Sequence, residues 1–199
     1  NVYNILGHHY ADQNDYVNAQ IYWEKGGLIH QELEDVEGIF TYLTHTTNLY
    51  TNRGDYLNAL AFSKKAFNLI EKSDTKDAVL IFLSYLNLGE MYGKLGEYDK
   101  ALDYYTKIIK YDTMYINNFW HYFYDDLGYI LYKQNAYNES IKYLSLADSI
   151  SNNCLLTKTN LYLSYKKLGK DYDVTEIHSL IKEADFNHYI EFELNYSLY

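Results

Sequence analysis

The sequence predicts an all-α fold, a solenoid of about five antiparallel helical hairpins in a single domain. Three observations predict it. A pattern of leucine-glycine, tyrosine and alanine positions recurs along the chain. The 199 residues include no proline, so no position breaks a helix by removing an amide donor. The hydrophobic content of 48% is ordinary for a globular protein and allows a substantial buried core.

Five hairpins are expected to follow one another along the chain. We place them at 1–35, 36–75, 76–113, 114–152 and 153–185, with a tail or partial hairpin at 186–199. The first helices are expected at 1–13, 37–52, 77–95, 114–134 and 154–168. The second helices are expected at 16–31, 56–71, 98–110, 137–151 and 172–184. The joints between hairpins are charged, and Ser73 and Asp74 are expected to cap helix ends in one of them.

The first two hairpins carry the pattern with one variation. The first hairpin has Leu6-Gly7, Tyr10, Ala19 and Trp23 at matching offsets. The second hairpin has Tyr50, Gly54-Asp55-Tyr56 and Ala59. There, Thr46-Thr47 replaces the leucine-glycine pair.

The third hairpin shows the physical basis of the pattern most clearly. Leu88 and Tyr92 lie four residues apart on one helix face, and Gly89 beside them leaves room for a close partner helix. Ala101 supplies the matching small surface on the second helix. Between the helices, Gly96 can take the left-handed conformation that ends a helix. The product is an antiparallel hairpin with a turn of a few residues.

The last two hairpins keep the register while the pattern weakens. The fourth has Leu127-Gly128, Tyr137, Ser140, Leu144 and Ala147; the fifth has Tyr165 and Leu168-Gly169. The anchors Ala19, Ala59, Ala101 and Ser140 are 40, 42 and 39 residues apart. One such hairpin cannot bury its own apolar face, so stacking of neighbours is expected to supply the stability.

These residues resemble the tetratricopeptide repeat, a right-handed superhelical array. The match is carried by Leu6-Gly7-Tyr10-Ala19-Trp23, Leu88-Gly89-Tyr92-Ala101-Tyr105 and Leu127-Gly128-Ala147. The family's unit has about 34 residues and ends in proline, whereas this chain has a longer period of roughly 40 and no proline. Long-period arrays of this kind are similar to those in bacterial sensor kinases and transcriptional regulators. The resemblance therefore implies recognition of a protein or peptide in a signalling setting.

Charge and composition exclude several partner classes. A net charge of -10 and a pI near 5.1 argue against binding of nucleic acid, which needs clustered basic residues. The longest apolar stretch, 78–86, is shorter than the roughly 18 residues needed to cross a bilayer, so no membrane insertion is expected. We expect a soluble, cytoplasmic or extracytoplasmic part of a longer signalling protein, since the chain opens without methionine.

In such an array the first helices line a concave groove, and the resemblance places a set of mostly polar side chains there. They are Asn4, His8, Thr44, Asn48, Asn52, Glu90, Lys94, Asp125, Tyr129 and Lys133, with Thr159 and Lys166 in the last hairpin. Asn48 and Asn52 suit an extended peptide, because an amide donates to and accepts from a peptide backbone at once. Solvated helix residues are the equally weighted alternative.

Other site classes are not expected. Some chaperone-binding relatives clamp a carboxylate with Lys, Asn and Arg, but the matching positions here are Asn4, His8, Leu83 and Asn87. Adjacent His8 and His9 diverge around a helix and cannot hold one metal ion. Asp125-Asp126 lacks a basic or nucleophilic partner, and lone Cys154 is expected to pack as a small apolar residue. We therefore expect no enzyme, cofactor or metal.

The function that fits best is a protein- or peptide-binding scaffold, the ligand-sensing or docking region of a bacterial signalling protein. The alternative is a structural assembly module that forms homo-oligomers. Its contacts would come from an end helix with Phe192 and Leu194 and from the aromatic run at 119–124, part of which we expect to reach an interface.

Overall fold

The computed structural model describes residues 2–109, 119–151, 154–175 and 177–179. The chain divides into two compact units, unit 1 at residues 1–115 and unit 2 at residues 116–199. Each unit is described by itself below. All regular elements in the described ranges are helices, which confirms the predicted all-α class.

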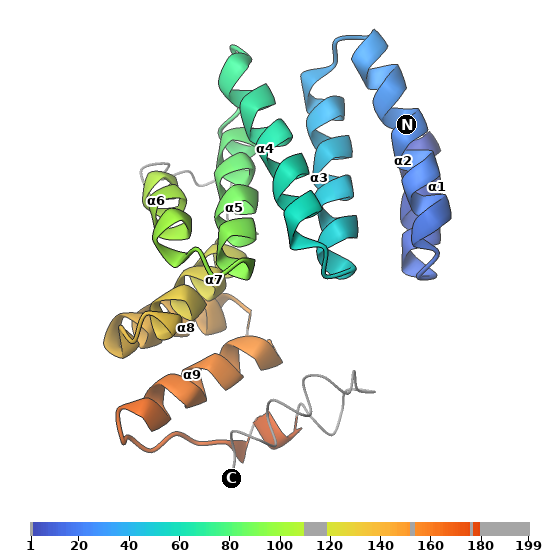
Figure 1. Cartoon of the computed structure of the whole chain (residues 1–199). Helices are drawn as coiled ribbons and strands as arrows, with labels where there is room; N and C mark the ends of the chain where they lie inside the picture. Colours follow the sequence, from blue (N-terminus) through green and yellow to red (C-terminus); the bar gives the residue numbers. More distant parts are fainter. Residues whose placement is uncertain (1, 110–118, 152–153, 176, 180–199) are drawn as a thin grey trace. The chain divides into compact units, whose positions relative to one another are not determined.

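Unit 1 consists of three antiparallel helical hairpins (Figure 1). Its helices are α1 (Val2–Asp12), α2 (Tyr16–Glu32), α3 (Val36–Asn52), α4 (Tyr56–Lys72), α5 (Ala78–Lys94) and α6 (Tyr98–Ile108). Each second helix also packs on the first helix of the next hairpin, α2 on α3 and α4 on α5. The helix bounds agree with the prediction to within two residues, so pattern and turn signals were sufficient here.

The described part of unit 2 contains one complete hairpin and the first helix of another. Its helices are α7 (Trp120–Lys133), α8 (Tyr137–Ile150) and α9 (Leu155–Lys167), and α8 packs on both neighbours. The helix predicted at 172–184 begins later than expected, because residues 170–174 are not helical. The carboxylate of Asp173 accepts hydrogen bonds from the backbone N–H and the hydroxyl of Thr175. The tail at 186–199 lies outside the described residues.

The turns inside the hairpins share one hydrogen-bonding scheme. The backbone N–H of Glu97 donates to the carbonyl of Tyr92 over 2.9 Å, and the intervening Gly96 has φ +76°. Five turns of this type place a left-handed residue at the same point, namely Asn14, Gly54, Gly96, Asn135 and Gly169. Leu168-Gly169 therefore forms the turn after α9 and corresponds to Leu95-Gly96.

The leucine-glycine pairs act as predicted. A Cβ added to Gly89 would collide with the ring of Tyr105, and one added to Gly128 would collide with Leu144. Ala101 is fully buried in the same hairpin as Gly89. Small residues thus allow each pair of helices to approach closely, with the aromatic or leucine side chain filling the remaining space.

Aspartates begin most helices of unit 1. The carboxylates of Asp15, Asp35 and Asp55 each accept a backbone N–H from three residues later. In the joint before α5 the N-cap is Asp77, whose carboxylate accepts from two backbone N–H groups. Of the two residues expected to cap helix ends here, Ser73 is the C-cap of α4 and its hydroxyl donates to the carbonyl of Ile70, whereas Asp74 caps neither helix.

Candidate ligand-binding face

The residues predicted to bind a ligand lie on first helices, and in unit 1 these helices touch one another. The imidazole rings of His8 on α1 and His45 on α3 lie 4.5 Å apart between centroids. The side-chain amide of Asn87 on α5 donates to the hydroxyl oxygen of Thr44 on α3 over 3.4 Å. Helix α3 therefore lies between α1 and α5.

Two exposed amides face outward from the middle of this arrangement. Asn48 and Asn52 are exposed, and we call these two residues the α3 strip. On one side of them, His45 contacts α1; on the other side, Thr44 and Thr51 contact α5. Because residues three, four and seven positions apart share a helix face, the α3 strip lies between these two lines of contact.

An acid and a base occupy the equivalent positions of α5. Glu90 and Lys94 follow Asn48 and Asn52 by 42 residues; Glu90 is half-buried and Lys94 is exposed. Burial raises the pKa of the Glu90 carboxyl, and the ammonium group of Lys94 one turn later opposes that rise. The pair adds charge beside the neutral amides of the α3 strip.

The α1 side of the face is an aromatic cluster that the sequence did not indicate. His8 contacts Trp23 edge-on at 5.6 Å, and Trp23 stacks on His45 at 4.9 Å. Burial, together with the nearby charge of His8, lowers the pKa of His45 to about 4. Of the two residues predicted on α1, His8 is exposed and takes part in these ring contacts, and Asn4 is half-buried.

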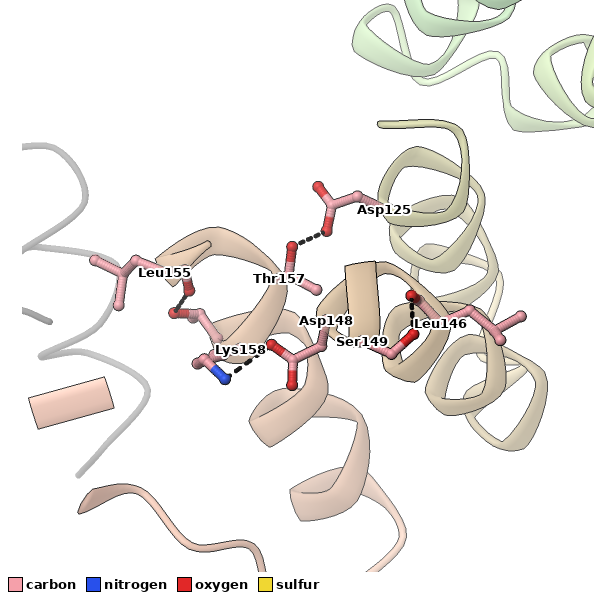
Figure 2. A network of polar contacts seen from close by, with 8 residues as sticks. Asp125, Leu146, Asp148, Ser149, Leu155, Thr157 and Lys158 are labelled. Atoms are coloured by element: carbon pink, nitrogen blue, oxygen red, sulfur yellow. Dashed lines mark hydrogen bonds and ion pairs between the residues drawn. The ribbon is translucent and has the colours of Figure 1, made fainter. Parts of the chain in front are cut away.

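In unit 2 the predicted residues take part in contacts within the fold. The Asp125 carboxylate of α7 accepts a hydrogen bond of 2.7 Å from the Thr157 hydroxyl of α9 (Figure 2). The ammonium group of Lys133 lies 5.1 Å from the ring centre of Tyr129, within reach of a cation–π attraction. Asp125 therefore helps to hold α7 against α9.

Helix α9 buries polar side chains, which corrects the groove prediction for one of them. Thr159 is 7% exposed, and its hydroxyl donates to the Leu155 carbonyl one turn earlier, so it does not lie on an open face. Lys166 is exposed and lies over the Tyr162 ring. Residues 157–161 are all buried, and such a run covers the whole circumference of the helix.

A buried ion pair joins α8 to α9. Lys158 is 3% exposed, and its ammonium nitrogen lies 2.8 Å from Asp148 Oδ1 (Figure 2). At this distance the opposite charges of the two side chains attract one another across the contact between the helices. Nearby on α9, Asn160 is 4% exposed and its side-chain nitrogen has no hydrogen-bond partner within the described part of the chain.

The aromatic run at 119–124 mostly packs within unit 2. Phe123 is fully buried, Trp120 packs against Phe123 and Tyr124, and Tyr124 stacks on Tyr143 of α8. Tyr122 is 56% exposed. Its role in an interface stays a prediction, as do the contacts of Phe192 and Leu194, which lie outside the described residues.

The described ranges contain no group of three or more His, Cys, Asp or Glu side chains that could hold a metal ion. His8 meets His45 of another helix, while Nε2 of His9 accepts a hydrogen bond from the side-chain amide of Gln13. Cys154 is half-buried. No helix in the described ranges is long and apolar enough to span a bilayer.

Comparison with known proteins identifies the repeat. Residues 47–113 match the family model of the tetratricopeptide repeat. A comparison with curated proteins gives no match. The matched segment covers α3 after its midpoint, α4, α5 and α6, and thus includes the α3 strip.

Solved structures share the fold at low sequence identity. A signal transduction ATPase with numerous domains and a tetratricopeptide-repeat sensor, from Pyrococcus horikoshii, is 22% identical with a TM-score of 0.68; the match covers 92% of this chain and 29% of that one. BtubC from P. vanneervenii is 17% identical with a TM-score of 0.68, and the match covers 97% of this chain and 80% of that one. A putative kinesin light chain with nearly identical repeats, from Podosopora anserina, is 13% identical with a TM-score of 0.64, and the match covers 92% of this chain and 91% of that one. The predicted fold, an array of tetratricopeptide-type hairpins, is thereby confirmed.

Proposed function

We propose that this chain, which carries tetratricopeptide repeats, binds a protein or an extended peptide across the first helices of unit 1. The fold is typical of protein-interaction scaffolds, and proteins built from it are in general not enzymes; we propose the same for this chain. The sensor of the P. horikoshii signal transduction ATPase has a similar fold. This likeness supports a ligand-sensing or docking role in a bacterial signalling protein.

The exposure of the α3 strip carries the proposal. Asn48 and Asn52 project from the helix that is flanked on both sides by other first helices. Neither amide is needed to hold α3 in place, because His45, Thr44 and Thr51 make the contacts with α1 and α5. The two amides are thus placed for contact with a molecule outside the fold.

The chemistry of the face suits a peptide main chain. Each asparagine offers a carbonyl acceptor and an amide donor, which match the N–H and carbonyl groups of an extended peptide. Glu90 and Lys94 on the adjacent helix add one anionic and one cationic contact for ligand side chains. A short peptide with polar or charged side chains is therefore the preferred ligand.

The test is selection from a displayed library of random peptides, followed by titration of the selected peptides with purified variants. Asn48→Ala combined with Asn52→Ala should weaken binding at least tenfold, since two amides with paired hydrogen bonds are lost. The melting temperature should stay the same because both side chains are exposed. Asn68→Ala with Asn138→Ala is the matched control, as these asparagines are exposed on the second helices α4 and α8. Equal affinity for the strip variant and the wild type would remove the α3 strip from the site.

A further inference from the structure

One carboxylate on the candidate ligand-binding face is partly buried and has no close partner. Glu90 of α5 is half-buried, and its carboxylate makes no hydrogen bond and no ion pair within the described part of the chain. Its oxygens still reach the surface of unit 1, because they are not among the buried polar atoms that lack a partner. This carboxylate has therefore lost part of its hydration and can still be reached by a molecule from solvent.

The contacts between α5 and α3 place this carboxylate beside the α3 strip. Asn87 and Met91 of α5 contact α3 through the hydroxyl groups of Thr44 and Thr51. Glu90 follows Asn87 by three residues and directly precedes Met91, so it lies within one turn of both contacts. Neighbouring helices are about 8–10 Å apart, and an extended peptide advances about 3.3 Å per residue. A peptide held by the α3 strip therefore reaches Glu90 within roughly three residues.

The repeat does not require an acid at this position. The equivalent residues of three other first helices are His8 on α1, Asn48 on α3 and Tyr129 on α7. On α5, burial raises the pKa of the Glu90 carboxyl, because the charged form loses hydration there. The acid is thus unfavourable for folding alone, whereas a cation bound beside it would offset the lost hydration.

Lys94, one turn further along α5, does not fill this role. Its charge opposes the effect of burial on Glu90 without cancelling it, and its ammonium group is exposed. An exposed ammonium is well hydrated, so an ion pair between Lys94 and an anionic ligand adds little to affinity. The partly dehydrated carboxylate gains more from an opposite charge, because solvent screens it less and its hydrogen-bonding sites are unfilled. Glu90 therefore sets the charge preference of this part of the face.

We propose that Glu90 selects the ligand, which is a peptide with a cationic group that pairs with the Glu90 carboxylate. The cation is a Lys or Arg side chain or an N-terminal ammonium, and it lies within about three residues of the segment bound by the α3 strip. This inference rests on the proposed binding of a peptide at the α3 strip and narrows the class of peptide. The net charge of -10 on the whole chain adds a long-range attraction for such a ligand.

Titration calorimetry with peptides from the displayed random library tests the pairing from both sides. Each peptide selected on the wild type is synthesised unchanged, with Lys and Arg replaced by Gln, and with an acetylated N-terminus. Glu90→Gln keeps the size of the side chain and should weaken binding of the unchanged peptides about tenfold or more, the effect of one hydrogen bond between charged groups. The peptide form that lacks the cation should bind the wild type equally weakly and lose nothing further on Glu90→Gln. Whichever form behaves in this way identifies the cation as a side chain or as the N-terminal ammonium.

Two further variants control for charge. Glu32→Gln is the matched control, because Glu32 is exposed on the second helix α2 and the variant has the same change in net charge. It should bind every peptide form as the wild type does. Lys94→Gln should bind the unchanged peptides as tightly as the wild type or more tightly, since it removes a like charge near the cation of the ligand.

The outcomes distinguish this inference from the proposed function. Peptides that depend on the α3 strip but bind Glu90→Gln as tightly as the wild type would overturn the inference and leave the proposed function standing. Weaker binding by Lys94→Gln would also overturn it, because the face would then recognise an anion. Selected peptides that ignore the α3 strip, or a library that yields no binder, would remove the proposed function and this inference together.

Discussion

Acidification should destabilise unit 1 through one enclosed imidazole, that of His45. Its ring is stacked on Trp23 and meets the edge of His8. A proton on His45 would therefore place a positive charge in the contact between the first two hairpins, beside a second imidazole. Burial lowers the pKa of His45 from 6.5 to about 4, and His8 is the neighbour whose charge adds to this effect. The folded chain therefore keeps His45 neutral where an unfolded chain does not.

The sign and size of the effect follow from proton linkage. As the pH falls below about 6.5, the unfolded chain takes up a proton at His45 and the folded chain does not, so the free energy of unfolding falls. The loss is complete once the pH is below the folded value of about 4. Each tenfold change in proton affinity corresponds to roughly 1.4 kcal/mol, so the loss in the free energy of unfolding is at most about 3 kcal/mol. Partial exposure of the ring to solvent makes the loss smaller than this limit.

Urea unfolding at a series of pH values from 7 to 4 measures this loss. The variant His45→Gln removes the titrating group, so its unfolding free energy should fall less than that of the wild type over the same interval. The carboxylates affect both proteins, and the difference between their profiles isolates the imidazole. His178→Gln, at an exposed position, should keep the wild-type profile. Parallel profiles for the wild type and His45→Gln, or an NMR titration of His45 near its ordinary value, would refute the reasoning.

Two further predictions concern packing and charge. Ala101→Leu should lower stability by roughly 1–3 kcal/mol, because Ala101 is fully buried, whereas Leu at exposed Ala61 should change the melting temperature little. Asp148→Ala should destabilise unit 2 by up to roughly 3 kcal/mol, because it removes one carboxylate that is paired with the buried ammonium of Lys158. Chemical denaturation measures both effects, with Glu139→Ala on the same helix as the control for Asp148; equal stability of each variant and its control would contradict the assignment.

Local rules were sufficient for the helices and turns. Gly96 and Ala101 could be assigned from sequence because each has one dominant physical role, a left-handed turn residue and a small helix contact. The spacing of about 40 residues then fixed the register of the hairpins. In the joint before α5, Ser73 caps the end of α4 as expected, but Asp77 and not Asp74 caps the start of α5, because both aspartates are good capping residues and only the path of the joint selects between them.

The interior of the candidate site could not be predicted in the same way. His45 follows Thr44 directly in the sequence, but its environment comes from Trp23 of another hairpin, which a local pattern does not show. Helix α9 is harder still, because polar Lys158 and Thr159 read as surface residues and are buried by tertiary contacts.

On the proposed function, buried positions hold the fold together and exposed positions contact the ligand, so the ligand-binding groups could change without a change in the core. On α5, Leu88, Gly89 and Tyr92 are buried, while Glu90 is half-buried and Lys94 is exposed. The α3 strip occupies the equivalent positions on the neighbouring helix. Substitutions there change hydrogen-bonding groups and charge but leave the helix contacts intact. Peptide affinity and melting temperature should therefore respond independently in variants of this face, whereas variants of the buried positions should change both together.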